Sequence, residues 1–206
     1  MAVIIDINSE QEDTLVSKTI NTLESGGVIL YPTDTVYGLG VDATNIQAVQ
    51  KLFYIKGRDY NKPFSIAVSS VEMLSKYAQI DMRVEKIINA FLPGPLTLVL
   101  PRTDKLPTEV VSGRENIGIR IPHHPTLLNI IKVFGKPVIT TSANKSGEEP
   151  HANPQDIIAS IPEIDLVLTQ GVLPEHTPST VVDLTQKDIT ILREGEISQK
   201  DIESVL

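Results

Sequence analysis

Short apolar runs alternate with amphipathic segments along most of this chain. Apolar runs of about four to seven residues predict buried strands, whereas apolar residues recurring every three or four positions predict helices. The expected strands are residues 3–5, 28–31, 64–68, 96–101, 116–122, 137–143, 165–170, 179–184 and 189–194. The expected helices are residues 10–25, a segment from about residue 46, 70–77, 82–91 and 125–134.

Local signals place several of the helix boundaries. Ser9 with Glu12, and Ser69 with Glu72, have the spacing of capping boxes, in which the two side chains satisfy each other's backbone amides. Gly135 follows an amphipathic helix directly, as expected for a left-handed C-terminal cap.

The order of these elements predicts an α/β fold. Several strands are joined through helices, while others follow each other too closely for a crossover, so the sheet should be mixed. A chain of 206 residues is long enough for one substantial domain, and two independent domains would each be small. We therefore expect a single domain over residues 1–206: a twisted, open mixed sheet with flanking helices.

Composition excludes several classes of protein. The chain has no cysteine, which excludes disulfides, thiolate zinc sites and cysteine nucleophiles. No apolar run approaches the roughly 20 residues of a membrane span, and the N-terminus shows no signal peptide, so we expect no membrane association and a cytoplasmic location. A net charge of −8 argues against a globally basic nucleic-acid binder but leaves room for a local basic cleft.

The residues that could bind a ligand lie where predicted strands run into polar loops. In open α/β sheets ligands bind at such strand ends. Short hydroxyl residues follow strands in YPTDTVYG, PGPLT, ITTSANKSG and HTPSTVVD. Isolated cations lie between these stretches at Lys56, Arg58, Lys62, Arg120 and Arg193. Taken singly, each cation is more often a solvated surface residue, but hydroxyls with scattered Arg and Lys are also the donors that a phosphate-bearing ligand requires.

The absence of several known motifs excludes the enzyme classes that depend on them. The sequence contains no P-loop, no dinucleotide-binding glycine motif, no nucleophile elbow and no zinc-protease motif. Asp34, Asp42 and Asp183 could help to hold Mg²⁺, although each carboxylate is at least as readily a turn or cap residue, Asp42 above all. The four histidines are scattered, and we expect the adjacent pair His123 and His124 to lie at the surface.

Together, seven motifs resemble a known family. PTDTVYGL, KGR with KP following, PGPLTLVL, RIP, TSANKSG, STVVD and REG occur in this order over almost the whole chain. They are similar to the YrdC-like domain of the threonylcarbamoyl-AMP synthases. The resemblance implies a twisted α/β fold with a large, locally basic cavity. It also implies a nucleotidyltransferase that joins L-threonine, bicarbonate and ATP into threonylcarbamoyl-AMP, releases pyrophosphate, and serves tRNA threonylcarbamoyladenosine modification.

The resemblance also implies roles for particular residues. Lys56 and Arg58 would be catalytic, with Mg²⁺ accompanying the ATP and no residue assigned as its ligand. Thr33 and Tyr37 would shape the cavity wall. L-threonine would be bound by Thr35, Arg120, Thr140 and Ser179. ATP would be bound by Arg58, Lys62, Ser142, Asn144, Pro150 and Arg193.

Partners and alternatives follow from the same resemblance. The product would pass to a threonylcarbamoyl transferase complex, and contact with tRNA is possible. Longer members carry a further C-terminal domain, and the end of this chain soon after REG indicates the single-domain form. Two other functions stay open: an RNA-binding module without catalysis, and a YciO-like paralogue with a different substrate.

Since Arg58 lies between Gly57 and Asp59 in a loop, we expect its truncation to cost little stability.

Overall fold

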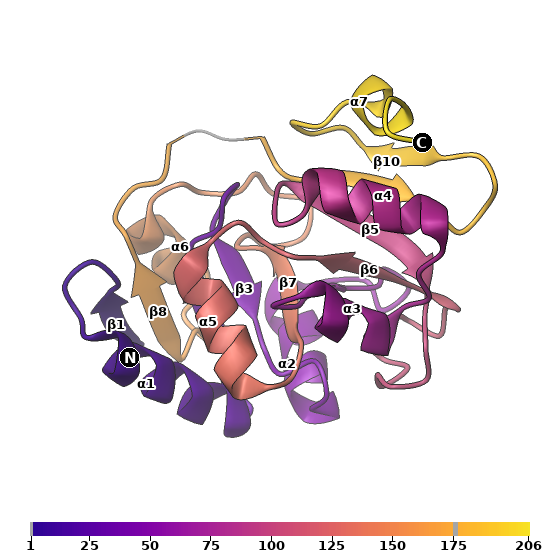
Figure 1. Ribbon diagram of the computed structural model, residues 1–206. Coiled ribbons are helices and arrows are strands. Elements are labelled where there is room, and N and C mark those ends of the chain that lie inside the picture. The colour runs from indigo at the N-terminus through magenta and orange to yellow at the C-terminus, as the bar shows by residue number, and fades with distance from the viewer. Residues whose placement is uncertain (1, 175–176) are drawn as a thin grey trace.

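A computed structural model describes residues 2–174 and 177–206, and its strands form one ten-stranded sheet (Figure 1). The strands in chain order are β1 Val3–Asp6, β2 Ile29–Tyr31, β3 Gly38–Gly40, β4 Ser65–Ala67, β5 Leu96–Pro101, β6 Asn116–Arg120, β7 Val138–Ser142, β8 Leu166–Thr169, β9 Thr180–Asp183 and β10 Thr190–Arg193. The helices are α1 Glu12–Glu24, α2 Ile46–Lys56, α3 Val71–Tyr77, α4 Met82–Phe91, α5 Pro125–Phe134, α6 Pro154–Ser160 and α7 Gln199–Glu203.

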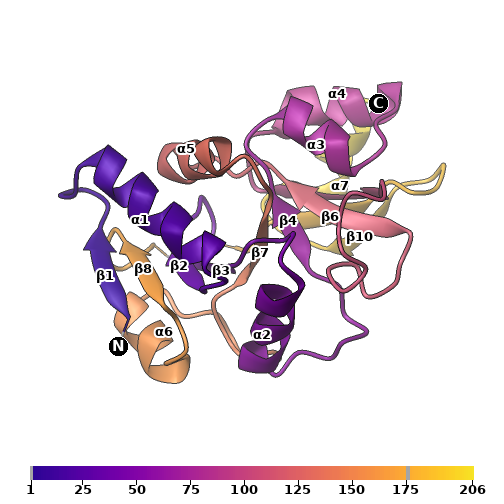
Figure 2. The same ribbon diagram turned by 90° about the horizontal axis from the view of Figure 1, so that it is seen from below.

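The sheet is mixed, as the spacing of the elements predicted. Its strand order is β1-β8-β2-β3-β7-β4-β6-β5-β9-β10. The pairs β1/β8, β2/β8, β4/β6 and β5/β9 are parallel, and the other five are antiparallel. Helices cover both faces: α1, α3, α4 and α5 lie on one side of the sheet, and α2 and α6 on the other (Figure 2). The predicted α/β class with flanking helices is confirmed.

Strand β3 was not expected from the sequence, because its two glycines disfavour a strand. It pairs antiparallel with β2, so that Tyr31 lies opposite Gly38. The Tyr31 ring covers both glycines: a Cβ added to Gly38 would meet the ring at 2.9 Å, and one added to Gly40 would meet it at 2.7 Å. An aromatic side chain on the partner strand thus supplies the packing that the glycines lack.

Both predicted capping boxes are wrong in detail. Helix α1 begins at Glu12 with Gln11 at its N-cap, and the Glu12 carboxylate accepts a hydrogen bond from Asn129 of α5 at 2.6 Å instead of reaching back. At α3 the cap is Ser70, whose Oγ accepts from the Met73 amide at 3.1 Å, one residue beyond the expected Ser69. Gly135 does end α5 in the left-handed conformation, with φ of 72°.

Helices α6 and α7 are too short for a periodic signal in the sequence. Helix α7 has a complete capping box between Ser198 and Asp201, in which the acid is aspartate instead of the more usual glutamate. Of the adjacent histidines, His123 is exposed as expected. His124 is instead partly buried at the N-cap of α5, where its Nδ1 accepts from the Leu127 amide at 3.4 Å. His176 lies outside the described residues.

Candidate ligand-binding cavity

A cavity of about 480 Å³ lies on one face of the sheet, within the usual size range of small-molecule sites. Successive side chains of a strand point to opposite faces, so alternate residues of adjacent strands form one floor. That floor carries Thr140 and Ser142 of β7, Ser65 of β4, Asn116, Gly118 and Arg120 of β6, Thr97 and Val99 of β5, and Val181 and Asp183 of β9. The alternate residues Ile117 and Ile119 of β6 are buried in the core.

Strand register aligns this floor across the sheet. Ser65 lies opposite both Thr140 and Gly118, and Val99 lies opposite both Gly118 and Asp183. A Cβ on Gly118 would collide with the Ser65 Oγ. The absence of a side chain at residue 118 therefore keeps the centre of the floor open.

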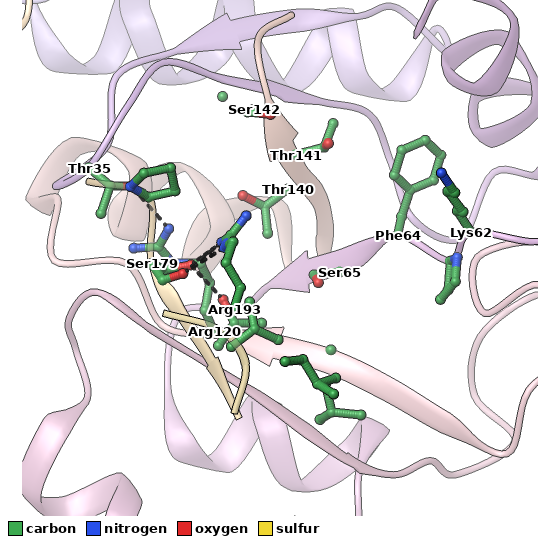
Figure 3. A pocket seen from close by; sticks show the side chains of 18 of the residues that line it. Thr35, Lys62, Phe64, Ser65, Arg120, Thr140, Thr141, Ser142, Ser179 and Arg193 are labelled. Carbon is green, nitrogen blue, oxygen red and sulfur yellow. Dashed lines mark hydrogen bonds between the residues drawn. The ribbon is translucent and has the colours of Figure 1, made fainter. Parts of the chain in front are cut away.

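Loops complete the wall at both ends of the cavity. In Figure 3, Lys62 and Phe64 lie on one side, whereas Thr35, Ser179, Arg193 and Arg120 lie together on the other. Arg58, Arg114 and Arg193 also line the cavity, and Asp183 is the single carboxylate among the described lining residues. The cavity is thus cationic although the chain carries a net charge of −8.

At the Thr35 end, hydrogen bonds hold the loop between β2 and β3. The Thr33 Oγ1 accepts from the amides of Thr35 and Val36 and donates to the Val36 carbonyl at 2.7 Å. Tyr37 is fully buried, and its phenol donates to the Gly171 carbonyl at 2.7 Å. These bonds fix Thr35, a residue that is 2% exposed, in the wall of the cavity.

Arg120 enters this end from the last residue of β6. Its Nη2 forms a buried ion pair with Asp34 Oδ1 at 2.6 Å, and its Nη1 donates to Thr35 Oγ1 at 3.4 Å. Arg120 Nε and Asp34 Oδ2 are buried without a protein partner. A guanidinium held in this way still has a donor left for a ligand, because the side chain carries five N–H groups.

Arg193 binds the neighbouring hydroxyl residue. Its Nε and Nη2 both donate to the Ser179 carbonyl, at 3.0 and 2.7 Å, and Nη2 also donates to Ser179 Oγ at 3.0 Å. The Ser179 hydroxyl lies 2.9 Å from that of Thr97. Burial, and then the nearby Arg120 charge, lower the pKa of Arg193. This end therefore combines two guanidinium groups with three hydroxyls.

At the other end, Arg58 is held more firmly than the sequence suggested. Its Nε donates to the Lys62 carbonyl at 2.9 Å and its Nη2 to the Pro63 carbonyl at 2.8 Å. The guanidinium carbon also lies 5.0 Å from the centre of the Phe64 ring, within cation–π range. Burial lowers the pKa of Arg58. Truncating Arg58 would release two carbonyls of its own loop, so these contacts favour a larger cost in stability than the sequence suggested.

Lys56 lies behind the cavity wall and is not one of its lining residues. It is the last residue of α2 and is 2% exposed. Its Nζ donates to the carbonyls of Ser142 and Asn144, each at 2.6 Å. Burial, and then the charge of Arg58, lower the pKa of Lys56 to about 7. In this position the side chain ties α2 to the end of β7.

Asn144 and Pro150 also lie outside the lining of the main cavity. The Asn144 side chain donates to the carbonyls of Lys145 and Glu148, at 2.9 and 2.6 Å, and so closes the loop after β7. Pro150 lines an adjoining cavity of about 280 Å³ that shares Thr35, Val36 and Pro178 with the main one. The remaining site residues named from the sequence all line the main cavity: Thr35, Arg58, Lys62, Arg120, Thr140, Ser142, Ser179 and Arg193.

The sequence reasoning missed five polar lining residues: Ser65, Thr97, Arg114, Asn116 and Thr141. Three of them had a usable signal. Thr97 and Thr141 lie within PGPLT and ITTSANKSG, two of the hydroxyl-bearing stretches, and Asn116 shares its strand face with Arg120 at a spacing of four residues. Ser65 and Arg114 had none, because a serine in a short strand and an arginine in a turn are ordinary surface choices.

Among the carboxylates considered for a metal, two are already engaged. Asp34 pairs with Arg120, and Asp42 pairs with Lys136 at 2.9 Å while its other oxygen accepts from Thr44, which makes it a turn residue as its sequence context indicated. Only Asp183 faces the cavity. Within residues 2–174 and 177–206, no three His, Asp or Glu side chains form a group that could hold a metal ion.

The fold and this cavity define an α/β ligand-binding protein whose site suits a small anionic molecule with hydroxyl or carboxylate groups. The family model Sua5/YciO/YrdC, described as "Telomere recombination", matches residues 21–195. The chain belongs to this family.

Three similar proteins extend the comparison. A threonylcarbamoyl-AMP synthase of Pyrococcus abyssi is 31% identical over all of this chain, which covers 61% of that protein. The crystal structure of P. abyssi Sua5 complexed with L-threonine has a TM-score of 0.92 at 30% identity, with 100% of this chain and 61% of that one covered. Escherichia coli YciO has a TM-score of 0.86 at 26% identity and 98% coverage of both chains. The chain thus spans about three fifths of the P. abyssi protein.

Proposed function

We propose that this protein is an L-threonylcarbamoyladenylate synthase. It would condense L-threonine, bicarbonate and ATP to threonylcarbamoyl-AMP and pyrophosphate, for tRNA threonylcarbamoyladenosine modification. Family membership and the likeness to a threonine-bound relative support this assignment. So does the presence, in one cavity, of donors for an amino acid and for a polyphosphate.

The observation that carries the proposal is the separation of the cations. Arg120 and Arg193 lie with the hydroxyls of Thr35 and Ser179 on one side of the cavity, and Lys62 lies on the other (Figure 3). An amino-acid carboxylate and a triphosphate both need positive charge but cannot share one guanidinium. Cations at opposite ends of a single sheet face would bind the two substrates side by side.

In the proposed reaction no enzyme group forms a covalent bond. The threonine amine attacks bicarbonate, an N–C bond forms, and water is lost to give the carbamate. A carbamate oxygen then attacks the α-phosphorus of ATP, and the bond to the β-phosphate oxygen breaks as pyrophosphate leaves. Holding the reactants in line can offset about 7–11 kcal/mol of the barrier. Arg58 and Lys62 would stabilise the negative charge that moves onto the leaving group.

Within this reaction, Lys56 would position backbone groups behind the cavity wall. Its ammonium holds the carbonyls of Ser142 and Asn144, and Ser142 lines the cavity beside Thr140. Below its pKa of about 7, its positive charge would also add to that of Arg58.

Magnesium would enter with the nucleotide. Asp183, the one carboxylate that lines the cavity in the described part of the chain, already accepts from the amide and hydroxyl of Thr185, at 2.9 and 2.7 Å, through Oδ1. This donor set fits an ion that keeps most of its ligands from phosphate and water, and bound in that way Mg²⁺ would neutralise phosphate charge.

The downstream partner would be a threonylcarbamoyl transferase complex, with which contact to tRNA is possible. None of the helices in the described part of the chain is long and apolar enough to cross a bilayer. We propose that the enzyme acts in the cytoplasm, where the tRNAs that the downstream transferase would modify are found.

Release of pyrophosphate from ATP, measured with and without L-threonine and bicarbonate, tests the proposal. Turnover that requires both substrates, with threonylcarbamoyl-AMP identified by mass spectrometry, is the expected result. Turnover with another amine or acyl acceptor would favour the YciO-like alternative. RNA binding without turnover under any condition would favour the RNA-binding module.

A further inference from the structure

Arg114 adds a cation to the cavity at a point that the proposed reaction does not yet use. It lies two residues before β6 and lines the same cavity as Asn116, Gly118 and Arg120. With a rise of about 3.3 Å per residue, the strand alone separates its two ends by about 13 Å. Arg114 therefore lies at the end of the cavity away from Arg120.

A run of three loop carbonyls joins Arg114 to the Lys62 end. Its Nη2 donates to the carbonyl of Asn61 at 3.1 Å. Arg58 donates to the next two carbonyls, those of Lys62 and Pro63. Two guanidinium groups from different parts of the chain thus grip consecutive residues of the loop that carries Lys62.

The backbone of Arg114 is itself fixed from behind. Two residues with left-handed backbone, Ser112 and Gly113, turn the chain into it, with φ of 53° and 73°. The Arg114 carbonyl accepts from Arg102 Nε at 2.9 Å, and the Arg102 side chain is 11% exposed. The guanidinium of Arg114 is therefore carried on an ordered turn, although the residue itself is exposed.

Two neighbouring carboxylates make their close contacts with groups other than Arg58, Lys62 and Arg114. Asp59 is in the same loop as Lys62, and its Oδ1 accepts from the amide and side chain of Asn61; these bonds, and then the Lys62 charge, lower the pKa of Asp59. Glu115 pairs with Arg102 at 3.4 Å. The salt bridges among the described residues include none to Arg58, Lys62 or Arg114.

We propose that Arg114 is a third phosphate-binding cation, which with Arg58 and Lys62 holds the β- and γ-phosphates of the nucleotide and the pyrophosphate that leaves. This inference rests on the proposed function, which assigns the phosphates of ATP to the Lys62 end of the cavity. A guanidinium offers a planar pair of donors that matches phosphate oxygens, and the Asn61 carbonyl occupies only one of its five N–H groups. The residue thereby distinguishes a polyphosphate from a monophosphate.

Binding of inorganic pyrophosphate and of AMP, measured by isothermal titration calorimetry on the full chain, tests this inference separately from turnover. Arg114→Met should weaken pyrophosphate binding at least tenfold, since a hydrogen bond to a charged group contributes that much or more, and should leave AMP binding within about twofold. Arg114→Lys should recover part of the affinity, because it keeps the charge and loses the fork.

Lys105→Met is the matched control. Lys105 lies on the same connection between β5 and β6, is exposed and lies outside the cavity lining, so its replacement removes one charge at a distance from the site. Equal losses of pyrophosphate affinity in the two variants would mean that Arg114 acts only through its charge at long range, and would overturn the inference. Wild-type pyrophosphate affinity in a folded Arg114→Met protein, or no pyrophosphate binding by the wild type, would also overturn it. Threonine-dependent turnover in that protein would still support the proposed function.

Discussion

At the scale of single residues, the cavity depends on charged groups that are buried and already paired. Arg120 is 6% exposed and Lys56 is 2% exposed, and each is held by oxygen atoms of the protein. Removing a charge from water costs several kcal/mol unless partners compensate. The partners of these two residues are therefore as important to the site as the residues themselves.

Asp34→Asn tests the partner of Arg120. The substitution keeps the shape of the side chain and removes the charge that orients the guanidinium, so Arg120 is left buried and uncompensated. We expect a loss of about 3 kcal/mol in the free energy of unfolding and an increase in the KM for threonine larger than any fall in kcat. Denaturant titration and steady-state kinetics measure the two effects. Asp188→Asn, an exposed change in the turn between β9 and β10, is the control, and matching behaviour of the two variants would contradict the prediction.

Lys56 makes stability depend on pH. Its pKa is about 7 in the folded protein, against 10.5 for a free lysine. Below pH 7 both states bind the proton and burial of the charge destabilises the fold in full. Between pH 7 and 10.5 the unfolded chain keeps a proton that the folded chain has lost, so this penalty falls as pH rises.

The free energy of unfolding of the wild type, minus that of Lys56→Met, should therefore increase by up to about 1.4 kcal/mol per pH unit above pH 7. Urea titrations of both proteins between pH 6 and 9 provide the comparison. A difference that stays constant over this range would show that the two carbonyl contacts keep the ammonium charged.

At the scale of elements, the β2–β3 hairpin and its loop build one wall of the site. The strand pairing sets Tyr31 over Gly38 and Gly40, and burial raises the pKa of its phenol to about 12, so the ring stays neutral. The loop that follows β2 carries Thr33 and Thr35. A change in the packing of the hairpin should therefore shift the residues of this loop that line the cavity.

Gly40→Ala tests this packing. The added methyl would lie 2.7 Å from both the Tyr31 ring and a Val138 methyl, and 2.9 Å from the Ile139 carbonyl oxygen, so the strands must move apart. Overpacking of this kind costs about 1–3 kcal/mol. Chemical denaturation should show that loss, whereas Ser75→Ala on the exposed face of α3 should stay within about 0.5 kcal/mol of wild type. A fully stable Gly40→Ala protein would mean that the hairpin is not packed in this way.

At the scale of the whole molecule, a cationic cavity lies in a chain with a net charge of −8. The net negative charge of the chain disfavours long polyanions, while the cavity cations attract a small anion at short range. Among the described residues, five cations line the cavity: Arg58, Lys62, Arg114, Arg120 and Arg193.

Ionic strength should therefore affect the two substrates differently. Screening at 0.5 M salt shortens the range of charge interactions to a few ångströms. We expect the KM for ATP to increase severalfold between 0.05 and 0.5 M NaCl, while the KM for threonine, a zwitterion, changes by less than about twofold. Initial rates of pyrophosphate release measure both. Equal changes would indicate that the nucleotide and the amino acid bind through similar charge contacts.

The sequence by itself determined the class of fold and named eight of the residues that line the cavity. Apolar periodicity predicted nearly every long element, because burial of one face requires that pattern locally. Most of the site residues named from the family resemblance line the cavity, among them Thr35, Arg58 and Arg120. Short elements were missed: β3 depends on the Tyr31 ring of a neighbouring strand, and α6 and α7 have too few residues for a period.

Only the tertiary structure decided which of the named residues reach the cavity and which support it. Lys56 and Arg58 stand two positions apart in the sequence, yet Arg58 lines the cavity and Lys56 lies behind it. The difference arises because α2 ends at Lys56 and the backbone of Gly57 turns into the left-handed conformation. Arg114 could not be distinguished from any surface arginine until strand register placed it beside the loop of Lys62. Contacts between residues this far apart depend on strand pairing, which no local pattern encodes.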